Sequence, residues 1–421
     1  MRWDVSRSLR MRPPALTAQS ARALDALNAL VASSQTGFGA FIAVYLTAQA
    51  WTQADIGQAL SLGTVVAMLS QLPAGVLVDA MRSKRLAVAL GGIAVALSAL
   101  LFAVSSAWLS VIGAEILHGF ASCMIGPAIA AVSLQLAGRA GLGVRLGRNA
   151  RWSSIGSAVA AVVLGAIGTY VSGAGVFWAT AVLMVLGLLT LRSLPPPPAE
   201  PRAALIAAET RGLPGAIWSL LNRRLLVFAG CVALFHLSNA AMLPLVANEV
   251  TRSTGAGANL VIAACVVVPQ AIVAGLSPLV GRTADSWGRR PVLLLGFAAL
   301  PVRGLLLALD AHPAYVVAVQ ALDGISAAVF GVMLPLVAAD LTRGTRRFNL
   351  CMGLLGLAAG AGATLSTAIA GLVADRFGNG PALLSLAVAG LASVLGLLAL
   401  QETRETRPGR SIAGAFGADA R

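Results

Sequence analysis

The sequence predicts an all-α polytopic membrane protein with twelve transmembrane helices in two pseudo-symmetric six-helix bundles. Composition is the first reason: of 421 residues, 58% are hydrophobic and 11% charged, and the mean hydropathy is +0.84. The second reason is that charged residues are absent from runs such as 86–114, 152–191 and 253–281. Each run exceeds the roughly 20 apolar residues that a helix needs to cross a bilayer. The third reason is a charged turn motif that occurs twice, 206 residues apart.

The predicted spans follow one another with short connections, except for one longer segment at the centre of the chain. They cover residues 22–48, 55–79, 86–105, 107–137, 150–171, 175–194, 224–250, 258–282, 290–310, 313–340, 347–376 and 380–401. This order divides the chain into an N-terminal bundle (1–194), a cytoplasmic linker (195–222), a C-terminal bundle (223–401) and a cytoplasmic tail (402–421).

The boundaries of these spans rest on charged and turn-forming segments. In the first half, basic segments at 82–85 and 139–151 precede the third and fifth spans. In the second half, the basic segment 343–347 precedes the eleventh span. Four consecutive prolines at 195–198 open the linker in an extended form, and 217–221 favours a short helix at the membrane surface.

The distribution of positive charge predicts the orientation of the chain. All but three of its 30 Lys and Arg residues fall at the termini or in connections on one side of the predicted bundle, the exceptions being Arg252, Arg303 and Arg376. Such an excess marks the cytoplasmic side, which places both termini in the cytoplasm. The net charge of +14 is therefore explained without nucleic acid, and a bacterial inner membrane is expected as the location.

Chemistry at a protein-bound cofactor is not expected. The four cysteines lie within apolar runs and lack metal-ligand spacing, so we predict no metal site and no disulfide framework. Signatures of zinc proteases, nucleotide-binding loops and serine hydrolases are also missing, and an enzyme with catalytic residues is therefore disfavoured.

The repeated motif reads GVLVDAMRSKR at 75–85 and GRTADSWGRRP at 281–291. In both copies a glycine is followed four residues later by an aspartate and then by a basic pair. Small residues let membrane helices approach closely. The aspartate is suited to accept hydrogen bonds at the N-terminus of a neighbouring helix, where the helix dipole favours negative charge.

This motif resembles the loop signature of the major facilitator superfamily, which lies between the second and third helices and again between the eighth and ninth. The second copy matches that signature at Gly281, Ala284, Asp285, Gly288, Arg289 and Arg290. The first copy departs from it, with Ala80 where a basic residue is usual and Arg82 where a glycine is usual. The segment GLVADRFG at 371–378 is similar to the eleventh helix of the superfamily, and the resemblance covers residues 22–401.

The two motif copies are expected to act as a gate rather than to bind a solute. Their carboxylates would brace the cytoplasmic ends of the helices in one conformation and release them in the other. The predicted cytoplasmic gate consists of Gly75, Asp79, Lys84, Arg85, Gly281, Asp285, Gly288, Arg289 and Arg290.

Polar side chains near the middle of predicted spans are candidates for a substrate or proton pathway, because such groups are costly in a membrane. In the facilitator fold that the resemblance implies, the first, fourth, seventh and tenth helices line a central cavity. The predicted pathway residues are Gln35, Glu115, His118, His236, Asn239, Arg303 and Asp323.

Several of these residues allow more than one role. Glu115 and His118 lie three apart on one helical face, where they could relay protons or form a local pair that supports packing. Asp323 occupies the place in the second half that corresponds to His118, and it could serve coupling or a structural hydrogen bond. Arg303 could neutralise Asp310 or Asp323, extend outward, or bind an anionic substrate.

The repeat, the paired turns and the titratable groups favour a secondary active transporter that moves a small organic solute by alternating access. Proton-coupled export by a monomer is the expected mode, with lipid, solute and protons as its partners. An importer or an uncoupled facilitator remains the nearest alternative. A membrane sensor that has lost transport is the alternative from a different class.

Overall fold

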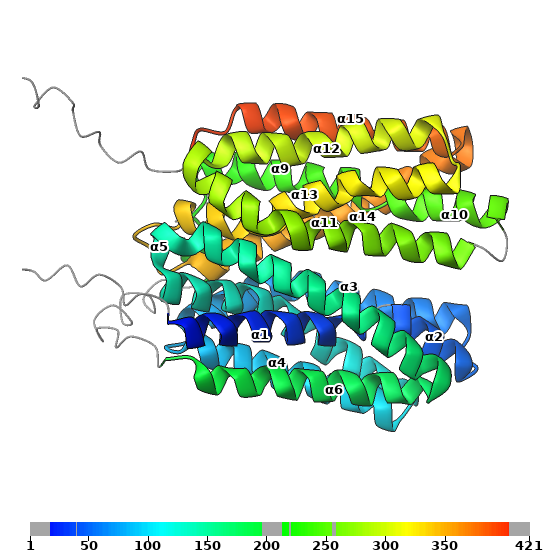
Figure 1. The fold of residues 1–421 in the computed structure, drawn as a ribbon, viewed down its shortest axis with the longest axis horizontal. Helices are drawn as coiled ribbons and strands as arrows, with labels where there is room; N and C mark the ends of the chain where they lie inside the picture. Colours follow the sequence, from blue (N-terminus) through cyan, green and yellow to red (C-terminus); the bar gives the residue numbers. More distant parts are fainter. Residues whose placement is uncertain (1–16, 39, 196–212, 219, 255–257, 404–421) are drawn as a thin grey trace, which may run out of the picture.

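The computed structural model describes residues 17–38, 40–195, 213–218, 220–254 and 258–403 (Figure 1). Helices are the regular elements of these residues, and eleven helical stretches are long and apolar enough to cross a membrane. One stretch, Trp108–Tyr170, contains 63 residues, which is enough for two crossings. The predicted all-α fold with twelve spans is thus confirmed.

The first half of the chain contains the helices that precede the linker. They are α1 (Ala18–Thr36), α2 (Ala40–Ala48), α3 (Gln53–Ala80), α4 (Lys84–Val104), α5 (Trp108–Tyr170), α6 (Gly173–Thr190) and the short 3-10 helix η1 (Leu191–Ser193). Thr52, Ser83 and Ser172 begin α3, α4 and α6, because each side-chain oxygen accepts a hydrogen bond from a backbone N–H of the first turn.

The second half begins after a short helix, α8 (Leu213–Trp218), in the latter part of the predicted linker. It contains α9 (Arg223–Asn239), α10 (Met242–Thr254), α11 (Ala258–Trp287), α12 (Arg289–Leu309), α13 (Pro313–Leu341), α14 (Phe348–Phe377) and α15 (Asn379–Leu398). Gly288 alone separates α11 from α12, and its φ of 103° explains why a glycine stands there. Most of the linker and of the predicted tail, 196–212 and 404–421, lie outside the described residues.

The predicted connection at 138–149 between the fourth and fifth spans is too long, because the chain breaks at Gly138 alone. Residues on both sides of Gly138 are helical, and only Gly138 departs from helical geometry, with φ 64° and ψ 173°. The arginines in this segment suggested a loop in water. Arg145 and Arg148 instead pair with the carboxylate of Asp25 on α1, so their charges are balanced against the helix bundle.

The first and seventh spans are broken rather than continuous. In the first span, α1 ends before Gly37, and an added Cβ on Gly37 would lie 1.9 Å from the hydroxyl oxygen of Thr180 on α6. The seventh breaks at Ala240 and Ala241, just before Pro244, whose ring is incompatible with a continuous helix there. The Ser366 hydroxyl accepts a hydrogen bond from the N–H of Ala241 and so satisfies one of the freed groups.

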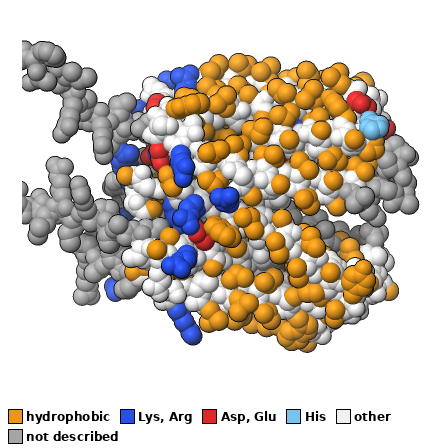
Figure 2. Space-filling model, viewed as in Figure 1, with side chains coloured by type: hydrophobic (Ala, Val, Ile, Leu, Met, Phe, Trp, Pro, Cys, Tyr) orange, Lys and Arg blue, Asp and Glu red, His pale blue; other side chains and the backbone are white. Residues whose placement is uncertain are grey.

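Buried apolar side chains form separate clusters in the two halves. Leu24, Phe102 and Phe177 belong to a large cluster in the first half, and Phe228, Phe297 and Leu336 belong to one that is centred on the second half. The face seen in Figure 2 is also largely apolar, and large apolar side chains such as Leu109 and Leu309 are exposed. This is the surface expected of a protein whose surroundings are lipid.

The two halves contact each other through two interfaces that are related by the repeat. An added Cβ on Gly75 of α3 would lie 2.5 Å from the backbone oxygen of Asn349 on α14. An added Cβ on Gly281 of α11 would lie 2.1 Å from the backbone oxygen of Gly143 on α5. Both pairs of positions differ by 206 residues.

The same two interfaces contain a second pair of close approaches. An added Cβ on Gly147 of α5 would lie 2.4 Å from the backbone oxygen of Ser277 on α11. An added Cβ on Gly353 of α14 would lie 2.2 Å from the backbone oxygen of Gln71 on α3. These positions again differ by 206 residues. The α3–α14 and α5–α11 contacts are therefore equivalent, as a pseudo-twofold relation between the halves requires.

Lys and Arg side chains gather at one end of the molecule, at the left of Figure 2. We call this the basic end; it contains the α3–α4 and α11–α12 turns and the start of α14. In Figure 1, α5 and α11 lie side by side near the basic end and diverge toward the other end. The close glycine contacts lie in the halves of α3 and α11 that reach the basic end.

Candidate functional site: a central cavity and a basic-end closure

Asp79, in the last turn of α3, joins the two halves at the basic end. Its carboxylate accepts hydrogen bonds from the backbone N–H of Asn349 (3.0 Å), the Asn349 side-chain amide (2.7 Å) and the backbone N–H of Leu350 (2.8 Å). The two backbone N–H groups belong to the first turn of α14 and therefore have no acceptor within their own helix. The contact therefore combines hydrogen bonds with the favourable end of a helix dipole.

The first residue of the basic pair in each motif copy stabilises its own turn. Lys84 Nζ donates to the backbone oxygens of Val78 (2.7 Å), Met81 (2.9 Å) and Asp79 (3.0 Å) at the end of α3. Arg289 donates to the backbone oxygen of Ala284 (2.7 Å) at the end of α11. Both cations thus bind carbonyls at a helix C-terminus, where the dipole favours positive charge.

The second residue of each basic pair connects the turn, by hydrogen bonds, to the last helix of the same half. Arg85 donates to the backbone oxygens of Leu194 (2.7 Å) and Pro195 (2.9 Å), after α6 and η1. Arg290 donates to the backbone oxygen of Leu398 (2.6 Å), at the end of α15. The third and sixth helices of each half are therefore joined in the same way.

Asp285 has a different partner from its counterpart Asp79. It pairs with Arg289 at 3.0 Å, and Arg289 also contacts Asp340 on α13 at 3.0 Å. The Asp285 carboxylate lies against Gly143, at whose position an added Cβ would be 2.8 Å from either of its oxygens. Asp79 thus accepts backbone N–H groups of the other half, whereas Asp285 is held by an arginine of its own half.

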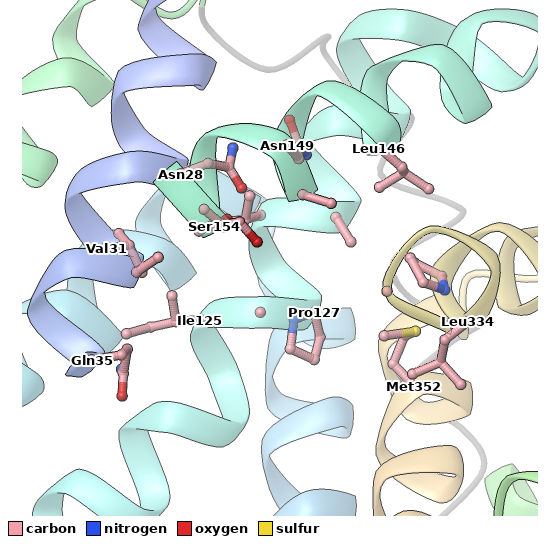
Figure 3. Close-up of a pocket in the computed structure, with 18 of the residues that line it drawn as sticks. Asn28, Val31, Gln35, Ile125, Pro127, Leu146, Asn149, Ser154, Leu334 and Met352 are labelled. Atoms are coloured by element: carbon pink, nitrogen blue, oxygen red, sulfur yellow. The ribbon is translucent and has the colours of Figure 1, made fainter. Parts of the chain in front are cut away.

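A cavity of about 530 Å³ lies between the halves, enclosed by parts of α1, α5, α11, α13 and α14 (Figure 3). We call it the central cavity. Its polar side chains all come from the first half; they are Asn28, Gln35, Ser122, Asn149, Ser153 and Ser154. The second half contributes only apolar or glycine residues, namely Val273, Ala327, Gly331, Leu334, Pro335 and Met352. None of the described residues that line it is charged or aromatic.

Gln35 is the one predicted pathway residue that lines the central cavity. Its Oε1 atom lies 2.9 Å from Nε2 of His118 and 3.4 Å from the hydroxyl of Ser122, both on α5. The His118 ring stacks on Phe38, with centroids 3.8 Å apart. His118 is therefore connected to the cavity through Gln35 and does not line it.

Glu115 does not pair with His118, contrary to one of the two expected arrangements. Its side chain points toward α3, where Oε2 occupies the space that a Cβ on Gly63 would need, at 2.0 Å. The residue is 4% exposed, and Oε1 has no hydrogen-bond partner among the residues that the structure describes. Glu115 is thus a buried carboxyl group next to, but separate from, the Gln35–His118 pair.

Arg303 on α12 is at the centre of a polar group that we call the Arg303 cluster. Its guanidinium donates to the side-chain oxygens of Asp323 (2.7 Å), Gln320 (2.7 Å) and Asn239 (2.5 Å). Arg303 is 1% exposed, and so Asp323 rather than Asp310 is the carboxylate that balances it. Three predicted pathway residues are brought together here, within the second half and away from the central cavity.

His236 is packed among aromatic rings, one turn before Asn239 on α9. Its ring makes an edge contact with Phe330 at 4.9 Å and with Phe235 at 5.4 Å. Its Nε2 atom is buried without a hydrogen-bond partner in the described part of the chain. His236 Nε2 is thus not hydrogen-bonded to any other predicted pathway residue that the structure describes.

Sequence reasoning missed several residues of these sites. Gln320 stands 205 residues after Glu115, as Asp323 stands after His118, so the repeat itself could have identified Gln320 as a partner of the cluster. Asn28, Asn149 and Ser154 carried no comparable signal, because neutral polar residues are common between membrane helices. The described residues contain no group of three or more His, Cys, Asp or Glu that could hold a metal ion.

The Arg303 cluster leads to a prediction about stability. Arg303→Met is expected to lower the stability of the folded protein by about 3 kcal/mol, because Asp323 would lose its buried cation. Combining it with Asp323→Leu is expected to recover most of the loss, since no unpaired charge remains. Thermal unfolding of the purified variants measures both effects. An unfolding temperature of Arg303→Met equal to that of the unmodified protein would contradict this account.

Twelve crossings, two halves related by a repeat and a cavity between them define a membrane transporter of the two-bundle kind. A family model, Major Facilitator Superfamily, matches residues 25–276 and 226–419. The chain belongs to the major facilitator superfamily.

Relatives support the same assignment. An uncharacterized MFS-type transporter of Mycobacterium tuberculosis, present in two strains, is 35% identical over 390 residues, which is 91% of this chain and 93% of that protein. Multidrug resistance protein 1 of Bacillus subtilis is 28% identical over 171 residues, covering 41% of this chain and 42% of that protein. The chain is therefore a multi-pass membrane transporter that works in a lipid bilayer on small-molecule substrates.

Solved structures share the fold. The fucose:proton symporter FucP of E. coli matches with a TM-score of 0.74 and 14% identity, over 91% of this chain and 98% of that one. The human organic anion transporter MFSD10 matches with a TM-score of 0.69 and 14% identity, over 90% and 99%. At these identities the likeness concerns the fold alone.

Proposed function

We propose that the protein is a secondary active transporter that exports a small organic solute in exchange for protons, acting as a monomer in the bacterial inner membrane. The central cavity is the observation that carries the proposal. It is lined by both halves of one chain, and so a single copy contains a complete site. Its volume falls within the range of sites that bind small organic molecules.

The basic end is the cytoplasmic side in this proposal, because Lys and Arg accumulate there. The Asp79 contact and the glycine interfaces then close the cavity on the cytoplasmic side. Opening that side requires these contacts to break, so the structure corresponds to one of two alternating states. The nine motif residues form the cytoplasmic gate.

Glu115 is the proposed proton carrier. A buried carboxyl group without a cation is expensive to keep ionised, so proton binding and release are coupled to changes in its surroundings. His118 and Gln35 connect the same helix to the cavity through hydrogen bonds. Asp323, by contrast, is paired with Arg303, which favours a structural role for that carboxylate.

Export is favoured over import by one relative. The Bacillus subtilis match is named a multidrug resistance protein, and it covers 41% of this chain. The symporter and the organic anion transporter match in fold only, so they do not favour import. An importer and an uncoupled facilitator therefore remain as alternatives that a transport assay separates.

Proteoliposomes with an imposed pH gradient provide that assay. A panel of labelled metabolites and antibiotics is offered outside vesicles whose interior is acidic, alkaline or matched to the medium. Exchange with protons predicts uptake driven by an acidic interior. Uptake driven by an alkaline interior would identify a symporter, and uptake that ignores the gradient would identify a facilitator. Thermal stabilisation by a compound without its transport would indicate a sensor.

A further inference from the structure

The central cavity has two chemically different walls, and this difference indicates what it binds. Figure 3 shows Asn28, Gln35 and Ser154 on one side, with apolar Val31 and Ile125 among them, and only apolar Leu334 and Met352 labelled on the other. The polar side belongs to α1 and α5 of the first half, and the apolar side to α13 and α14 of the second. A ligand that fills the space must present different chemistry to each half.

The polar wall offers neutral hydrogen-bonding groups of both kinds. Gln35 Oε1 faces His118 and Ser122, which directs the Gln35 NH₂ group, a donor, elsewhere. Asn28 donates through Nδ2 to the backbone oxygen of Leu24 at 2.7 Å, so its Oδ1 atom remains an acceptor. The Ser153 and Ser154 hydroxyls can donate or accept. Such a set suits hydroxyl, amide or carbonyl groups.

Charged groups close to this wall are engaged with one another and with neighbouring amides. Asp25, one turn below Asn28, is paired with Arg145 and Arg148. Arg145 also donates to the Asn149 side-chain oxygen at 2.8 Å, and Asn149 in turn donates to Ser133 at 2.8 Å. None of the described residues that line the cavity is charged, so a charged ligand would meet no counter-charge within it and would pay a considerable desolvation cost.

We propose that the central cavity takes an uncharged amphiphile whose hydrogen-bonding edge is held by the first half and whose aliphatic face lies against the second. This inference rests on the proposed transport function for its biological meaning, since it names the substrate class of the same site. The size of the cavity, about 530 Å³, suits a drug-sized molecule. The lining lacks a ring on which an aromatic ligand could stack, so shape and hydrogen bonds determine recognition.

Thiol labelling tests the chemistry of the cavity without knowledge of the substrate. Ser154→Cys places a thiol on the polar wall and Met352→Cys one on the apolar wall, after the four buried native cysteines are replaced by alanine. The probes are methanethiosulfonates that carry a benzyl, a trimethylammonium-ethyl or a sulfonatoethyl group. The labelling rate constant of each reagent is divided by its rate constant with free cysteine, which removes differences in intrinsic reactivity.

The benzyl reagent is expected to label both positions at least about tenfold faster than either charged reagent, because only the charged ones must be desolvated. Equal or faster labelling by a charged reagent at either position would overturn the inference. Ser153→Cys, also on the polar wall, serves if Ser154→Cys does not fold. Labelling does not require transport, so this test of the cavity is valid even if the transport assay detects no proton-coupled export.

A second pair of probes tests the orientation of the ligand. Hydroxyethyl and propyl methanethiosulfonates are similar in size and differ in one hydroxyl group. The ratio of their rates is expected to be about fivefold higher at Ser154→Cys than at Met352→Cys, the effect of one net hydrogen bond. Equal ratios at the two positions would refute the assignment of the polar edge to the first half.

Discussion

Glu115→Gln is expected to abolish accumulation of the solute driven by a pH gradient while leaving exchange of labelled for unlabelled solute in place. The substitution removes the proposed proton site but keeps the shape of the side chain. Glutamine fits, since the second half carries Gln320 at the equivalent position. One proton per solute supports about tenfold accumulation per pH unit, so the variant should lose at least that factor.

The control for this variant is Asp55→Asn, which alters an exposed carboxylate in the first turn of α3. It is expected to retain gradient-driven accumulation. Proteoliposome uptake with an acidic interior measures both variants, and exchange at matched pH shows that each is folded and binds solute. Gradient-driven accumulation that persists in Glu115→Gln would remove this residue from the coupling mechanism.

Gly281→Ala is expected to reduce transport by at least about tenfold. The added Cβ would lie 2.1 Å from the backbone oxygen of Gly143, a contact that flexible side chains cannot relieve. Overpacking of this kind costs about 1–3 kcal/mol. Because the contact exists only where α5 and α11 meet, the cost disfavours the state closed at the basic end.

Gly275→Ala is the matched control, since it lies on the same helix and an added Cβ meets no atom within 4 Å. Alanine favours a helix over glycine by about 1 kcal/mol, so this variant should be at least as stable as the unmodified protein. Initial rates of exchange and thermal unfolding distinguish the two. Equal transport by both alanine variants would show that the α5–α11 contact does not limit the cycle.

The sequence was sufficient for the number of crossings and for the relation between the halves. Long uncharged runs require burial in lipid, and the spacing between motif copies predicts equivalent contacts in both halves. It was not sufficient for the length of the connection between the fourth and fifth spans, which is Gly138 alone. Arginines in 139–151 look the same locally whether they face water or pair with a distant carboxylate, and Asp25 lies 120 residues before Arg145.

The depth of the candidate site residues in the membrane was predictable, but the side of the helix on which each residue lies was not. Counting residues from a helix end gives the depth of a side chain, and it placed Gln35, His118 and Asp323 near the middle of the bundle. It does not give the side of the helix that faces the cavity, which depends on packing against other helices. Gln35 therefore lines the cavity, whereas His118 stands behind it and Asp323 faces Arg303.

The turn between the fourth and fifth spans is shorter in the first half than in the second. In the first half, the helical segment before Gly138 carries Pro127 of the cavity, and the segment after it carries Ser154 of the cavity together with Gly143 and Gly147 of the α11 interface. In the second half, residues 342–347 separate α13 from α14. The segment that holds Ser154 against the solute is thus also the one that packs on α11, so separating that contact would carry part of the polar lining with it.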